Sequence, residues 1–175
     1  MSVRFAPGTT STFNHKAFER IDKNDAALLI IDHQVGLFQM VKDFTPAEFR
    51  NNILAHASLG KLFNLPVILT TSTESVSLTL VIRRSEQSLN PRYVLFICQY
   101  VCTTFSAMSL RGAGYTVYGN ADASGTSPAK AAEDAKARMR SAGIHVYSTF
   151  AIVCDLTRDR RNKPGASEAL PWPDR

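Results

Sequence analysis

Apolar runs with the length of a β-strand recur along this chain, and segments with helical spacing lie between them. The first run, Ala26–Ile31, is unbroken by polar residues, which is typical of a parallel strand buried on both faces. Further strand-like runs follow at residues 66–71, 78–82, 93–98, 115–118 and 145–153. The alternation of strand and helix signals predicts an α/β fold with a largely parallel sheet.

Three segments carry the start and stop signals of helices. One begins at the capping-box threonine Thr45 and is expected to run to about Phe63. A second is expected after Cys102, over residues 103–111, where two glycines close it. A third runs from residue 127 to about 142 and stops at a glycine. The tail, residues 163–175, holds three prolines and is predicted to be irregular and to reach over a neighbouring subunit.

The segment from residue 73 to 92 does not follow this alternation. Only residues 83–92 separate the strand-like runs at 78–82 and 93–98. A parallel pair of strands needs a crossover of a dozen or more residues, usually with a helix. Two interpretations stay open: the two runs pair antiparallel, or the segment packs irregularly.

Composition narrows the class of protein. The 175 residues fit one domain spanning 1–175, with residues 1–20 as a leader, residues 73–100 as a divergent or shortened segment and residues 163–175 as the tail. The net charge of +5 is spread along the chain without aromatic platforms, so no nucleic-acid partner is expected. No apolar run approaches the roughly 18 residues that span a bilayer, so no membrane partner is expected either.

The three cysteines indicate a reducing compartment. Their number is odd, and they show no spacing typical of a metal site. The cytoplasm is therefore the expected location, with a mitochondrial presequence as the weaker alternative. No cofactor is expected. A metal site is not expected either, because His33 has no partner histidine at ligand spacing. Cys98 and Cys154 are interpreted as inert core residues.

Two residues carry candidate chemistry. Cys102 lies where a strand-like run gives way to a helical one, and the partial positive charge of a helix N-terminus stabilises a thiolate. Asp32 directly follows the first strand, and in an open α/β sheet both side chains are expected to reach the same crevice. The alternative for Asp32 is a cap on the segment that follows. Phe38, Phe44 and Phe49 favour core or interface packing over a substrate cage.

Several of these segments, read together, resemble the isochorismatase-like cysteine hydrolases, and most closely their YcaC-type members. The matching residues are 25–34, 65–72, 101–115, 121–126, 138–143 and 150–162. The resemblance implies a doubly wound parallel sheet flanked by helices, a homo-oligomer, and hydrolysis of a small amide or related carbonyl compound. It also implies that Asp32 takes the thiol proton and that Cys102 attacks the carbonyl to form a thioester. Arg84 loosely matches the basic residue of YcaC-type members, and the alternative for it is a surface arginine.

The chain departs from the family pattern between Ser72 and Cys102. Family members have a much longer segment here, which carries the basic residue and a crossover helix, so one crossover helix is missing from the expected fold. Phe96 also stands where the family has a glycine, and Gln99 and Tyr100 replace its Thr-Glu or Thr-Asp pair. Two functions therefore stay open: a cysteine hydrolase, or a catalytically impaired relative (a pseudoenzyme, splice variant or mis-predicted product) that retains only binding or assembly surface.

Overall fold

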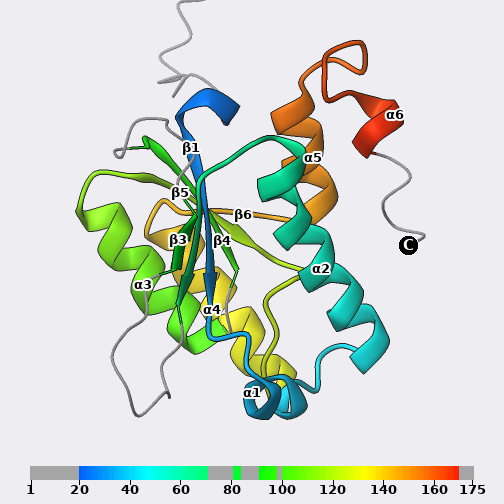
Figure 1. Ribbon diagram of the computed structural model, residues 1–175. Helices are drawn as coiled ribbons and strands as arrows, with labels where there is room; N and C mark the ends of the chain where they lie inside the picture. The colour runs from blue at the N-terminus through cyan, green and yellow to red at the C-terminus, as the bar shows by residue number, and fades with distance from the viewer. Residues whose placement is uncertain (1–19, 71–80, 84–90, 98–99, 170–175) are drawn as a thin grey trace, which may run out of the picture.

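A six-stranded sheet with helices on both faces forms the protein (Figure 1). The computed structural model describes residues 20–70, 81–83, 91–97 and 100–169. The strand order is β3-β2-β1-β4-β5-β6, in which β3 is antiparallel to β2 and every other neighbouring pair is parallel. The strands are β1 (Ala26–Ile31), β2 (Val67–Thr70), β3 (Val81–Arg83), β4 (Tyr93–Ile97), β5 (Thr116–Asn120) and β6 (His145–Tyr147).

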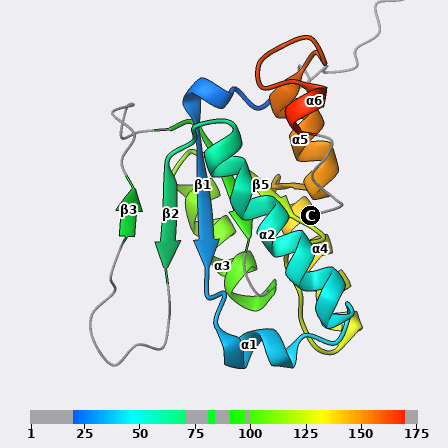
Figure 2. The same cartoon turned by 45° about the vertical axis from the view of Figure 1, so that its right-hand side comes forward.

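Helices lie on both faces of the sheet. They are α1 (Val35–Met40), α2 (Pro46–Leu62), α3 (Tyr100–Gly112), α4 (Ala129–Ser141), α5 (Thr149–Thr157) and α6 (Ala166–Ala169), with a short 3-10 helix, η1 (Lys23–Asp25), before β1. Helices α2 and α5 lie over one face, and α3 and α4 lie over the other (Figures 1 and 2). This is the doubly wound α/β arrangement expected for the family.

The core has a main cluster on each face of the sheet. Leu28, Leu59 and Ile152 belong to the cluster beneath α2 and α5, and all three side chains are fully buried. Ala107, Val117 and Met139 belong to the cluster beneath α3 and α4. Because strand side chains alternate between faces, apolar strands supply both clusters at once.

The first strand and the first long helix confirm the sequence predictions. β1 has the predicted limits and pairs in parallel with both β2 and β4. The hydroxyl of Thr45 accepts a hydrogen bond from the N–H of Glu48 at 3.3 Å, so Thr45 caps α2 as predicted. The strong local signals, an unbroken apolar run and a capping motif, therefore hold in the folded chain.

Of the two interpretations left open for this segment, antiparallel pairing of the runs at 78–82 and 93–98 is wrong, because β3 pairs with β2 instead. Ile68 of β2 lies opposite Ile82, and β3 runs opposite to β2 at the edge of the sheet (Figure 2). Because β3 runs opposite to β2, it brings the chain back to the end of the sheet at which the parallel strands, β4 included, begin. In a parallel sheet a crossover helix usually makes this return. Between β2 and β4, the described residues hold this strand and no helix.

Two predictions near the C-terminus are corrected. Residues 145–153 were expected to form one strand, but β6 ends at Tyr147 and α5 begins at Thr149. The hydroxyl of Ser148 accepts from the N–H of Ala151 and caps α5, whose buried positions recur at helical spacing. The tail, expected to be irregular, contains the single turn α6.

Close packing between α2 and β2 leads to one prediction on stability. A Cβ added at Gly60 would overlap Cγ2 of Val67, whereas one added at Gly112 of α3 would meet no atom within 4 Å. We expect Gly60→Ala to destabilise the protein by about 1–2 kcal/mol, because overpacking outweighs the gain in helix propensity. Gly112→Ala, the matched control, is expected to be neutral or stabilising. Urea unfolding of both variants measures the difference, and equal midpoints would contradict the expectation.

Candidate active site

Asp32 lies at the carboxyl end of β1 and is only 4% exposed. Its N–H donates to the carbonyl of Thr70 at 3.0 Å, which extends the pairing of β1 with β2 by one residue. Its φ is +54°, in the left-handed region that aspartate tolerates better than most residues. Oδ1 is buried and makes no hydrogen bond with the described residues. A buried carboxylate oxygen without a partner is available for a reacting group.

The capping interpretation of Asp32 does not agree with the structure. The helix that follows, α1, has Gln34 as its N-cap residue, and no side chain caps it. The N–H of Gln34 instead donates to the backbone carbonyl of Asp32 at 2.8 Å. The Asp32 side chain thus does not cap α1.

Cys102 belongs to the first turn of α3, close to the end of β4. Helix α3 begins at Tyr100, three residues before the predicted start, so Cys102 is its third residue. β4 is the parallel neighbour of β1, with Ile97 opposite Ile30, so Asp32 and the start of α3 follow neighbouring strands at the same edge of the sheet. The Cys102 side chain and the residues Cys98 and Gln99 lie outside the described set.

The third predicted residue, Arg84, lies outside the described residues. β3 ends at Arg83, directly before it. The basic member of the site therefore stays a prediction.

A buried polar network that the sequence did not reveal includes His56, whose pKa the neighbouring His33 affects. Asn120, at the end of β5, is 1% exposed, and its Oδ1 accepts from the N–H groups of Asp122 at 2.9 Å and Ala123 at 2.8 Å. Its Nδ2 donates to Oγ1 of Thr149 at 2.7 Å and lies 2.7 Å from Nδ1 of His56. Because Oδ1 accepts from two backbone N–H groups, the orientation of the amide is fixed, so Nδ2 is the donor and Nδ1 of His56 accepts.

This assignment leaves the proton of His56 on Nε2, an atom that is buried and makes no hydrogen bond with the described residues. Burial, together with the smaller effect of the nearby His33, lowers the pKa of His56 to about 3. Burial likewise lowers the pKa of His33 to about 4, although the charge of Asp32 opposes this shift. Both imidazoles are therefore neutral at pH 7, and His33 adjoins the only carboxylate of the candidate site among the described residues.

A cavity of about 290 Å³ opens beside these groups, between α1 and α2. It is lined by His33, Gln34, Val35, Phe38, Arg50, Ile53 and Leu54. A smaller recess, which Asp32 itself lines, shares His33 and Phe38 with it. The lining is mostly apolar with a few polar groups, as in many small-molecule sites. Arg50 was not among the predicted residues, and no motif marks it.

The aromatic residues near this cavity pack mainly on one another. Phe49 is 3% exposed and stacks with Phe38 and Phe44, with ring centroids 5.4 Å and 5.8 Å apart. The predicted packing role fits Phe49, whereas Phe38 also lines the cavity. In the part of the chain that the structure describes, no group of three or more His, Cys, Asp or Glu residues is arranged to hold a metal ion.

Cys154 is not a core residue, contrary to the prediction. It is exposed and free, because the buried face of α5 is formed by Ile152, Val153 and Leu156. The apolar residues next to Cys154 in the sequence form the buried face of α5, whereas Cys154 itself lies on the exposed face.

The fold and the edge shared by Asp32 and α3 define a class: an α/β protein with a candidate catalytic site at the carboxyl edge of its sheet. No protein-family model matches the chain. The Escherichia coli protein YcaC, named a probable hydrolase, is 35% identical over 176 residues, which cover 84% of this chain and 85% of YcaC. The chain belongs to the isochorismatase-like hydrolase family, among its YcaC-type members.

Solved structures agree with this assignment. Escherichia coli YcaC, described as an octameric hydrolase of unknown specificity, superimposes with a TM-score of 0.76 at 33% identity, covering 91% of this chain and 95% of that one. Pseudomonas aeruginosa YcaC, solved with hexane-2,5-diol and covalent acrylamide, gives 0.75 at 33% identity, covering 90% and 95%. An isochorismatase-family protein from Burkholderia thailandensis, 15% identical, gives 0.59 over 76% and 96% and shares the fold.

No described helix has the length and apolar character needed to cross a membrane.

Proposed function

We propose that the chain is a cysteine hydrolase of a small amide or related carbonyl compound, with Cys102 as nucleophile and Asp32 as base. One observation carries the proposal: Asp32, buried and with an unpartnered Oδ1, and the first turn of α3 follow neighbouring parallel strands. The covalent acrylamide of the Pseudomonas aeruginosa relative supports the nucleophile, because acrylamide is attached covalently when a group such as a thiolate adds to its vinyl carbon.

In the proposed reaction, the Asp32 carboxylate takes the proton of the Cys102 thiol, and the thiolate attacks the substrate carbonyl carbon. Backbone N–H groups in the first turn of α3 stabilise the resulting oxyanion. The C–N bond then breaks, the leaving amine takes the proton from Asp32, and a thioester remains. Water attacks the thioester, Asp32 takes a proton from it, and the thiolate leaves with that proton. Arg84 is proposed as the cation that pairs with Asp32 beside the thiol.

The adjoining cavity supports a small substrate. Its volume of about 290 Å³ lies near the lower end of ordinary ligand sites. Apolar residues of α1 and α2 provide most of its lining, and His33 and Arg50 provide polar groups. We propose that it receives the part of the substrate that does not react.

A second candidate function, a catalytically impaired relative, is favoured by one specific observation. β3 is antiparallel to β2 in the segment where the resemblance requires a crossover helix and the basic residue. Such a relative would keep binding or assembly surface without turnover.

Alkylation of the cysteines separates these two functions. If Cys102 is an activated nucleophile, it is expected to react with iodoacetamide about tenfold faster near neutral pH than the exposed Cys154, because only a thiolate attacks. Trypsin places the two in different peptides, residues 93–111 and 141–158. The first peptide also contains Cys98, so fragment-ion mass spectra are needed to assign its label to Cys102. Asp32→Asn is expected to slow Cys102 alone. Equal and slow rates at both cysteines would favour the impaired relative.

We further propose that the chain forms a homo-oligomer in a reducing, cytoplasmic compartment. The octamer described for Escherichia coli YcaC supports the assembly, as do the exposed apolar side chains Val35 and Leu54. The free Cys154 is consistent with a reducing compartment. Light scattering coupled to gel filtration tests the assembly, and a monomeric mass would contradict it.

A further inference from the structure

A second cavity, remote in sequence from the candidate active site, lies between α5 and α6. It has a volume of about 250 Å³, and we call it the α5–α6 cavity. Phe150, Val153 and Ala169 form its apolar wall, and Phe150 remains 60% exposed. An exposed phenylalanine beside a cavity provides apolar contact area that the folded chain does not use.

The polar side of the α5–α6 cavity is positively charged. Arg158 and Arg160 line it, and no acidic residue does. The nearest acid in sequence, Asp159, is engaged elsewhere: its Oδ2 accepts from Nη2 of Arg161 at 2.6 Å. Two cations therefore face one small cavity without a carboxylate among its lining residues.

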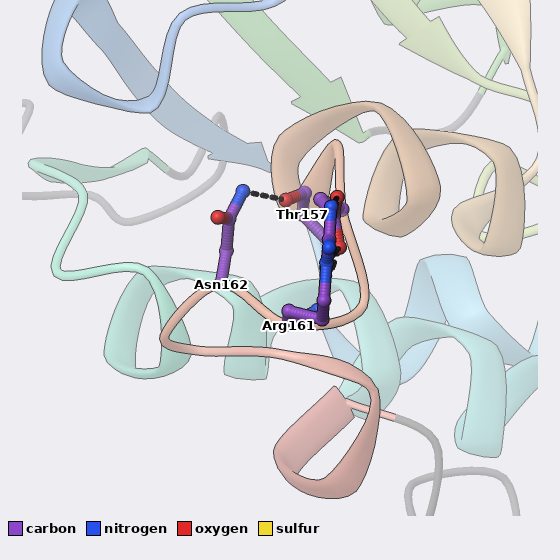
Figure 3. Close-up of polar contacts among 4 residues, drawn as sticks. Thr157, Arg161 and Asn162 are labelled. Atoms are coloured by element: carbon purple, nitrogen blue, oxygen red, sulfur yellow. Dashed lines mark hydrogen bonds and ion pairs between the residues drawn. The ribbon is translucent and has the colours of Figure 1, made fainter.

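The turn that carries these arginines is held in place by its own contacts. Nδ2 of Asn162 donates to the carbonyl of Thr157 at 2.9 Å (Figure 3). Arg158, the C-cap of α5, has a φ of +59°, a conformation that glycine adopts more easily than arginine. Nη2 of Arg158 donates to the carbonyl of Ile21, so this side chain is already positioned. Strained residues that surrounding contacts hold in place cluster at ligand sites.

The cavity wall also holds a hydroxyl without a hydrogen-bond partner. Thr157 lines the cavity and is 9% exposed, and its Oγ1 is buried and makes no hydrogen bond with the described residues. Most buried hydroxyls in proteins are paired, so an unpaired one beside two arginines calls for an explanation. Together, an apolar wall, two cations and a hydroxyl fit an amphipathic anion.

We propose that the α5–α6 cavity binds a small aliphatic carboxylate, with its chain against Phe150 and Val153 and its carboxylate on Arg158 and Arg160. The hydroxyl group of Thr157 donates one further hydrogen bond to this carboxylate. The volume of the cavity would hold roughly eight water molecules at about 30 Å³ each. Hexanoate, with six carbon and two oxygen atoms, has about the same number of non-hydrogen atoms. This site is separate from the proposed active site and does not depend on the hydrolase function.

Cys154 lines the same cavity and serves as its reporter. Iodoacetate is an anion and iodoacetamide is its neutral counterpart, so the ratio of their rates isolates the attraction of the cavity for a carboxylate. At Cys154 this ratio is expected to exceed that of the neutral thiol 2-mercaptoethanol by about fivefold, the effect of one unit charge at contact distance in water. The tryptic peptide 141–158 reports Cys154 alone. A ratio equal to that of 2-mercaptoethanol would overturn the proposal.

Competition identifies the ligand class. Hexanoate is expected to protect Cys154 from iodoacetamide, whereas acetate, hexanol and hexylamine at equal concentration are expected to protect it weakly or not at all. Equal protection by hexanol would mean that the cavity recognises only the chain. A Cys154 that reacts with neither reagent would mean that the C-terminal residues or a second copy of the chain cover the cavity, and this result also overturns the proposal.

Single substitutions assign the contacts. Arg160→Gln is expected to reduce both the rate ratio and hexanoate protection, whereas the matched control Arg140→Gln, on α4, changes the net charge equally and is expected to alter neither. Thr157→Val keeps the shape of the side chain and removes Oγ1, so it is expected to weaken hexanoate protection without lowering the melting temperature. If Arg160→Gln and Arg140→Gln behave alike, the α5–α6 cavity does not bind carboxylates.

Discussion

Asn120→Leu is expected to lower the free energy of unfolding by about 4 kcal/mol, because leucine has a similar size but no polar atoms. Asn120 contacts two backbone N–H groups, of Asp122 and Ala123, and two side chains, of His56 and Thr149. All four partners would remain close to a side chain that cannot pair with them. Unsatisfied buried polar groups are costly because water does not reach them.

Urea unfolding followed by circular dichroism at neutral pH measures this loss. The matched control is Asn162→Leu, which removes one hydrogen bond, to the carbonyl of Thr157, at an exposed side chain. We expect the control to lose about 0.5 kcal/mol or less, as exposed substitutions usually do. Equal losses in the two variants would show that the network adds no stability. In the double variant Asn120→Leu with His56→Leu, the loss is expected to be smaller than the sum of the single losses, because both partners of one contact are removed.

The sequence was sufficient for the parts of the fold that local physics determines. An apolar run without polar residues has few alternatives to a buried strand, so β1 was predicted with its observed limits. The cap at Thr45 acts on a backbone group three residues away, so it too was visible in the sequence. The placement of Asp32 at the carboxyl end of β1 followed from the same strand.

Pairings between distant segments were not predictable in this way. β3 has two strands as potential neighbours, and its choice of β2 depends on the whole sheet and not on its own residues. The same holds for the contact between Asn120 and His56, which lie 64 positions apart. A histidine and an asparagine on separate elements carry no shared spacing, so nothing in the sequence marks them as partners.

The predictions for residues 145–153 and for Cys154 went wrong for a common reason. β-Branched and aromatic residues after Tyr147 favour a strand by composition, but the cap at Ser148 and the buried positions Ile152, Val153 and Leu156 are helical. Once α5 is a helix, the side of Cys154 faces away from these residues and is exposed. The helical spacing of the buried residues, and not the strand-favouring composition of the segment, therefore indicates the structure that residues 149–157 adopt.

Mild acid is expected to destabilise the protein strongly, because His56 and His33 are held neutral in the folded state. Burial lowers their pKa values to about 3 and about 4, whereas in the unfolded chain both take up protons below about pH 6.5. The unfolded state therefore binds more protons between about pH 6.5 and 4. The stability that these two histidines contribute is complete above pH 6.5 and is lost as the pH falls, at up to about 1.4 kcal/mol per pH unit for each histidine.

At about pH 5, the two groups together are expected to remove about 4 kcal/mol, a large part of the stability of an ordinary domain. Urea unfolding at a series of pH values between about 7 and 5 measures the slope. His56→Leu is expected to be no more stable than the parent at pH 7, since Asn120 loses a partner, yet to lose stability half as steeply on acidification. His33→Gln is expected to reduce the slope similarly, and the double variant to flatten it. If the double variant keeps the full slope, carboxylates and not the buried histidines control the acid response, and the neutral state assigned to His56 would be wrong.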